Sequence, residues 1–110
     1  MGVELLSRIR EAARGLPALL GVKARAVIVF GSAARPEDFV PGLSDVDVLI
    51  ISEGEPKQRR YCLELLGHRF EVSVLKLEEV LKAFEEGDPL AHMLSRGIFA
   101  YDDGVSRLLP

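Results

Sequence analysis

Hydrophobic positions along the chain follow two spacings, which divide it into helices and strands. Over residues 3–14 a hydrophobic side chain returns every turn with charged residues between, which predicts an amphipathic helix that covers a sheet. The same spacing predicts helices over 57–66 and 77–86, each followed by a glycine that can end it. A last helix is expected to begin after the N-cap Asp88 and to end at Gly97.

Strands are predicted where hydrophobic residues are continuous or alternate with polar ones. The runs 26–30 and 46–51 are short, apolar and rich in β-branched residues, which is typical of strands buried on both faces. Residues 69–75 alternate and have one apolar face, and 98–101 form a short last strand. This order of elements predicts one α/β (α+β) domain over residues 1–110, with a mixed sheet of about four strands flanked by helices.

Composition fits a soluble globular domain and excludes several classes of protein. Of the 110 residues, 48% are hydrophobic and 28% are charged, and the net charge of −3 argues against strong, non-specific nucleic-acid binding. The basic residues Lys57, Arg59 and Arg60 are interpreted as the solvent face of a helix. The single cysteine, Cys62, excludes an internal disulfide framework and multi-cysteine zinc sites, and we expect it to be buried. The chain has neither an apolar run of ~18 residues nor a signal-peptide pattern, so no membrane association and a cytoplasmic location are expected.

Two carboxylates stand at the start of the second apolar run. Asp45 and Asp47 are two positions apart, so on a strand both project from the same face. They would repel each other and be costly to desolvate, and a divalent cation such as Mg²⁺ relieves both penalties. The alternative is that Asp45 ends a loop and Asp47 is an ordinary exposed strand residue.

A third acid, Glu71, lies on the polar face of the alternating strand 69–75. If that strand neighbours the one carrying Asp45 and Asp47, three carboxylates meet, as a two-metal site for phosphoryl transfer requires. The alternative for Glu71 is a solvent-facing strand residue without a function.

The first apolar run ends in Gly31-Ser32, and this position gives a common dipeptide a possible role. Glycine allows a sharp turn close to a phosphate, and a serine hydroxyl with free N–H groups at a helix start favours an anion. No lysine follows, which excludes a P-loop. Arg35 is within reach of triphosphate oxygens, although a surface arginine is the more ordinary interpretation.

Together these segments resemble the signature of the minimal nucleotidyltransferases of the DNA polymerase beta superfamily. The residues that carry the resemblance are Gly31-Ser32, Ser44-Asp45-Val46-Asp47, Phe70-Glu71-Val72 and the closing strand that follows Gly97. The resemblance implies a polymerase-beta-like nucleotidyltransferase fold, Mg²⁺ dependence and transfer of AMP from ATP. It implies that Gly31 and Ser32 hold the triphosphate, that Asp45 and Asp47 bind metal, and that Glu71 serves as base or metal ligand.

Short proteins of this type also resemble the antitoxins of toxin–antitoxin pairs. Their partners are helical HEPN-domain toxins, which they bind and in some cases adenylylate. This chain departs from the family pattern at Pro36, where glycine is common, and at Glu71, where aspartate is common. A binding module that neutralises a HEPN partner with a vestigial site therefore stays open as an alternative. A small-molecule, antibiotic-type transferase stays open too, in which a homo-oligomer supplies the second wall of the site.

Overall fold

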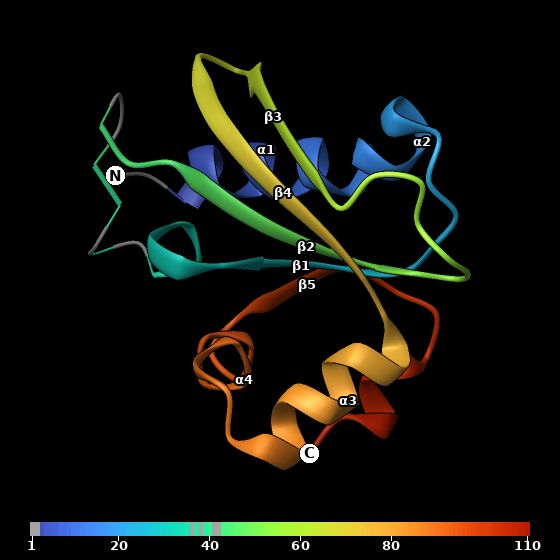
Figure 1. Cartoon of the computed structure of the whole chain (residues 1–110). Coiled ribbons are helices and arrows are strands. Elements are labelled where there is room, and N and C mark those ends of the chain that lie inside the picture. The colour runs from blue at the N-terminus through green and yellow to red at the C-terminus, as the bar shows by residue number, and fades with distance from the viewer. Residues whose placement is uncertain (1–2, 36, 38, 41–42) are drawn as a thin grey trace.

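Five strands form one mixed sheet at the centre of the computed structural model, which describes residues 3–35, 37, 39–40 and 43–110 (Figure 1). Across the sheet the strands lie in the order β3-β4-β2-β1-β5. β2 runs parallel to β4, and the other neighbouring pairs are antiparallel. The strands are β1 (Ala24–Phe30), β2 (Val46–Ser52), β3 (Arg60–Leu65), β4 (His68–Lys76) and β5 (Ile98–Asp102).

Helices lie on both faces of this sheet. One face carries α1 and α2, and the other carries α3 and α4, as Figure 1 shows. Two short 3-10 helices, η1 and η2, follow β1 and β5. The bounds are α1 (Val3–Arg14), α2 (Leu16–Leu20), η1 (Gly31–Ala34), α3 (Leu77–Glu86), α4 (Pro89–Leu94) and η2 (Val105–Leu108).

The two central strands are apolar on both faces because each face meets a helical layer. Alternate residues of β1 enter two separate hydrophobic clusters. Val27 and Val29 pack in the cluster of Ile9 from α1, whereas Ile28 packs in the cluster of Val80 from α3. The buried strands predicted from the continuous apolar runs are therefore confirmed. The helices predicted over 3–14, over 77–86 and after Asp88 are confirmed as well.

The helix predicted over 57–66 is wrong, and this error accounts for the missing fifth strand. Arg60–Leu65 form the edge strand β3, which pairs with β4 as a hairpin. Leu66 and Gly67 make its two-residue turn with φ angles of 55° and 73°. Positive φ at both positions matches a type I′ turn, so Gly67 ends a strand and not a helix. The leucines, arginines and glutamate of this segment favour a helix locally, but pairing with β4 overrides that preference.

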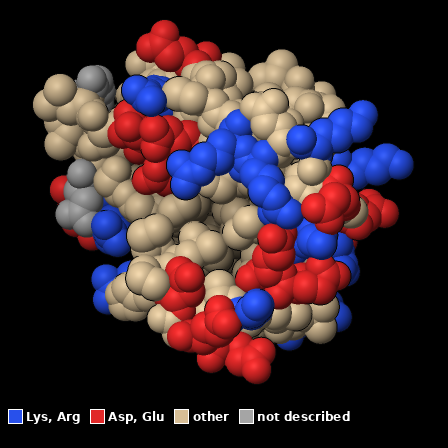
Figure 2. Space-filling model, in the orientation of Figure 1, with Lys and Arg blue, Asp and Glu red and all other residues tan. Residues whose placement is uncertain are grey.

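α3 and α4 cover only part of their face of the sheet. The hydrophobic cluster beneath them draws on β1, β2 and β5, and Leu75 is the contribution of β4. In the described part of the chain, no β3 residue joins that cluster, and Cys62, expected to be buried, is exposed. Figure 2 shows a hollow on this face, bordered by acidic and by basic side chains. The open area over β3 and β4 is where a ligand can reach the sheet.

Candidate active site

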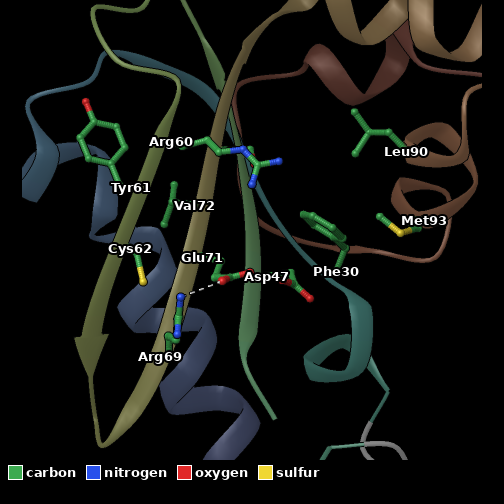
Figure 3. A pocket seen from close by; sticks show the side chains of 11 residues that line it. Phe30, Asp47, Arg60, Tyr61, Cys62, Arg69, Glu71, Val72, Leu90 and Met93 are labelled. Atoms are coloured by element: carbon green, nitrogen blue, oxygen red, sulfur yellow. Dashed lines mark ion pairs between the residues drawn. The ribbon is translucent and has the colours of Figure 1, made fainter.

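Strand register places the acids of two strands side by side on the open face. Asp47 of β2 is paired with Phe30 of β1 on one side and with Glu71 of β4 on the other. Cys62 of β3 is paired in turn with Glu71. Paired residues project from the same face of a sheet, so these side chains form a row across it. The sequence predicted Glu71 beside the aspartates only if their two strands were neighbours. β2 and β4 are neighbours, so this condition is met (Figure 3).

Gly31 brings the backbone directly against Asp47 at the end of β1. Its φ of +69° lies in the left-handed region, which favours glycine. A Cβ at this position would lie 2.5 Å from Asp47 Oδ2, so no larger residue fits without a shift. The chain then enters η1, whose first turn contains Ser32. The predicted sharp glycine turn after the strand is confirmed, and it lies next to a carboxylate.

The surroundings of Asp47 disfavour the charged form of its carboxyl group. Burial is the largest effect that raises the pKa of Asp47, and the negative charges of Glu71 and Asp45 raise it further. A carboxylate that is half-buried beside two like charges gains strongly from a cation placed between them. Binding of a cation next to Asp47 would therefore be favourable.

Glu71 already has one cationic neighbour, Arg69, two residues earlier on the same face of β4. Arg69 Nη2 lies 3.3 Å from Glu71 Oε1. The pKa of Arg69 is raised first by its contact with Cys62 and then by the charges of Glu71 and Asp45. The guanidinium therefore offsets part of the negative charge at this end of the row.

The donor set fits a magnesium ion that shares its coordination with a substrate. Over residues 3–35, 37, 39–40 and 43–110, no three acidic, histidine or cysteine side chains lie close enough to hold a metal by themselves. Mg²⁺ is usually held by one or two carboxylates, while waters and substrate phosphates complete the octahedron. Asp47 and Glu71 can supply those two carboxylates. The two-metal site with three acids stays a prediction.

A pocket of about 500 Å³ opens over this row, within the usual range for ligand sites. The sheet supplies its polar floor, and α4 supplies an apolar wall with Leu90 and Met93 (Figure 3). Arg60 and Arg69 lie on the side of β3 and β4. The pocket is lined by Phe30, Asp47, Arg60, Tyr61, Cys62, Arg69, Glu71, Val72, Ser73, Leu90 and Met93.

The remaining predicted site residues are not part of the lining of this pocket. Asp45 precedes β2 and is near enough for its charge to raise the pKa of Asp47. Ser32 follows Gly31 in η1, and Arg35 is extended immediately after it, as expected before a proline. Among the described residues, neither Ser32 nor Arg35 lines the pocket. Pro36, the departure noted in the sequence, lies outside the described residues.

The basic residues of the pocket, Arg60 and Arg69, were not predicted as site residues from the sequence. Arg69 could have been found, because it stands two positions before Glu71 on an alternating strand. Arg60 and Cys62 were not assigned to the site because the segment 57–66, which contains them, was predicted to be a helix and not a strand. The period-two placement of Tyr61 and Leu63 was the available signal for a strand, and it would have put Arg60 on the same face as Glu71.

Comparison with known families agrees with this geometry. The family model for a nucleotidyltransferase domain matches residues 8–96, which is most of the chain. The chain belongs to the nucleotidyltransferase domain family. The match spans β1, Gly31, both candidate acids in the pocket and α4. The five-stranded mixed sheet flanked by helices is consistent with the polymerase-beta-like nucleotidyltransferase fold.

General nucleotidyl transfer is thus supported at the level of the family, with a nucleotide as substrate. No curated protein matches the chain. Within the described residues, every helix is too short or too polar to cross a membrane.

Proposed function

We propose that this nucleotidyltransferase domain uses Mg²⁺ to transfer AMP from ATP to a hydroxyl group of a protein acceptor. The observation that carries the proposal is the register pair of Asp47 and Glu71 at the floor of an open pocket, with Asp47 close to the backbone of Gly31. Burial and the neighbouring negative charges raise the pKa of Asp47, and a cation bound to phosphate would relieve both effects.

In the proposed reaction the acceptor oxygen forms a bond to the α-phosphorus of ATP. The bond between that phosphorus and the oxygen bridging to the β-phosphate breaks, and pyrophosphate leaves. Asp47, Asp45 and Glu71 would hold the cation, and Glu71 also accepts the hydroxyl proton as general base. Gly31 and Ser32 hold the triphosphate, with Arg35 near its outer oxygens. Bound Mg²⁺ supplies charge neutralisation for the phosphates and for the developing negative charge.

The proposed acceptor is a helical HEPN-domain toxin, which would make this protein the antitoxin of a pair in the cytoplasm. The pocket supports an external acceptor, since α3 and α4 cover only part of their face of the sheet and leave the area over β3 and β4 uncovered among the described residues. A homo-oligomer that closes the pocket would instead favour a small-molecule acceptor.

A second candidate function is a binding module that silences its partner by complex formation without catalysis. The observation that favours it is the ion pair of Glu71 with Arg69, which occupies the third acid. In the described chain no three ligands converge on a metal position. A vestigial site would tolerate both features.

The two functions differ in whether label moves from ATP to the partner. We expect that ATP labelled at the α-phosphate, Mg²⁺ and the protein encoded by the adjacent reading frame together give a labelled partner. Asp47→Asn should reduce labelling at least about a hundredfold, because the metal ligand acts at the reacting phosphate.

The matched control is Asp88→Asn, since asparagine also caps a helix and Asp88 lies at α4 and outside the pocket lining. An unlabelled partner that is nevertheless bound and silenced by both variants would support the binding module. Equal labelling by Asp47→Asn and the parent protein would refute the proposed catalytic site.

A further inference from the structure

The pocket contains a basic side chain to which the proposed reaction gives no role. Arg60 projects from β3, across β4, towards the middle of the pocket (Figure 3). In the part of the chain that the structure describes, no carboxylate lies within ion-pair distance of its guanidinium. Arg69, the other arginine of the pocket, is already paired with Glu71 at 3.3 Å. Arg60 is therefore the cation of this pocket that is left for a ligand.

Arg59, the residue before Arg60, differs from it because its guanidinium is paired with carboxylates. Arg59 Nη1 lies 2.8 Å from Glu79 Oε1, and its Nη2 lies 3.3 Å from Glu55 Oε1. Arg59 is thus held by acids of the β2–β3 connection and of α3. Two consecutive arginines have opposite surroundings, one neutralised by carboxylates and one placed over the pocket floor beside Ser73.

The position of Arg60 relative to the acids determines which substrate it can meet. Across the open face the order is Gly31 at the end of β1, then Asp47 on β2, Glu71 on β4 and finally β3 with Arg60. In an in-line displacement the attacking oxygen and the leaving oxygen lie on opposite sides of the phosphorus. If the pyrophosphate leaves on the Gly31 side, as the proposed function has it, the acceptor enters over Glu71 from the β3 side.

We infer that Arg60 is a specificity-determining residue that binds an anionic group, a phosphate or a carboxylate, carried by the acceptor near its reactive hydroxyl. A guanidinium suits both groups because its planar donors match two oxygens at once. The inference rests on the proposed function for the assignment of the two sides. It adds that the acceptor is acidic next to the site of transfer, whereas the nucleotide is held without Arg60.

The test compares Arg60→Gln with Arg59→Gln, a neutralised neighbour on the same segment. Calorimetry first measures binding of α,β-methylene ATP with Mg²⁺, an analogue that resists cleavage at the reacting bond. NMR titrations at constant ionic strength then measure the affinity of the analogue-saturated protein for inorganic phosphate and, separately, for succinate. Both titrations are repeated without nucleotide.

We expect all three proteins to bind the analogue within about twofold of one another. The parent protein and Arg59→Gln should bind phosphate, succinate or both, and Arg60→Gln should bind the same anion at least about tenfold more weakly. Binding of phosphate alone identifies a phosphorylated acceptor, and binding of succinate alone identifies an acceptor that carries carboxylates.

Three results would overturn the inference. They are parent-like anion binding by Arg60→Gln, no anion binding by the parent protein, and a tenfold loss of analogue binding in Arg60→Gln, which would assign Arg60 to the triphosphate. If the parent protein does not bind the analogue at all, the proposed function fails by itself. The titrations without nucleotide then decide whether Arg60 binds an anion.

Discussion

Asp47 combines burial, like-charged neighbours and contact with a glycine backbone at one position. Burial and the charges of Glu71 and Asp45 all raise its pKa, so the protein keeps an unfavourable charge there. Residues selected for stability alone avoid such a position, and perturbed carboxylates in clefts are typical of functional sites. Gly31 supports the same interpretation, because a residue without a Cβ lets the backbone lie this close to Asp47.

Gly31→Ala should therefore damage the site more than the fold. The added Cβ would lie 2.5 Å from Asp47 Oδ2 in a left-handed backbone conformation, so the carboxylate must move. We expect nucleotidyl transfer to fall about tenfold or more, since small displacements at a reacting centre are costly. The free energy of unfolding should fall by about 1 kcal/mol.

Gly54→Ala is the control for this substitution, because its Cβ would meet nothing within 4 Å. Kinetic assays and thermal unfolding of both variants measure the two effects. Full activity of Gly31→Ala would show that the position of Asp47 against Gly31 is irrelevant to the reaction.

At the scale of elements, the β3–β4 hairpin creates half of the pocket and also contains a local conflict. Its turn places Leu66, a residue with a Cβ, at φ 55°, and the side chain is 45% exposed. A type I′ turn favours asparagine or glycine at this position. The hairpin is thus held by its pairing with β4 and not by its turn residues.

Leu66→Asn should stabilise the protein by about 0.5–1 kcal/mol, because asparagine tolerates the left-handed conformation better than leucine. Chemical unfolding measures the change. Leu19→Asn is the control, since Leu19 is 62% exposed in the helix α2 and should show no gain. A lower stability of Leu66→Asn would mean that Leu66 makes contacts worth more than the strain of its backbone.

The elements that sequence predicts well are those whose pattern is local. The helix over 77–86 is reproduced, as is the cap at Asp88, because spacing and capping residues lie within the same segment. β3 was missed because its partner strand decides its structure, and a strand's pairing is not encoded in its own composition. Alternation over 69–75 was enough to put Glu71 on the polar face, but Arg60 was lost with the strand that carries it.

At the scale of the whole molecule, the proposed function depends on incomplete coverage of one sheet face. α3 and α4 bury the apolar side of the central strands and leave the face of β3 and β4 open, with acids and arginines beside the hollow (Figure 2). This opening arises from where the helices dock, so the sequence predicted the acids but not the pocket around them. An external acceptor is expected for the same reason, because the domain does not close over its own site.

The central claim is that Asp47 and Glu71 bind a nucleotide through a shared divalent cation. Calorimetric titration of α,β-methylene ATP into the parent protein, Asp47→Asn, Glu71→Gln and the control Asp88→Asn, each with and without Mg²⁺, tests it most directly. We predict that the parent protein and Asp88→Asn bind the analogue at least about tenfold more tightly with Mg²⁺, and that Asp47→Asn and Glu71→Gln lose this dependence. Binding by the parent protein that is indifferent to Mg²⁺, or a Mg²⁺ effect that survives in Asp47→Asn, would contradict the account.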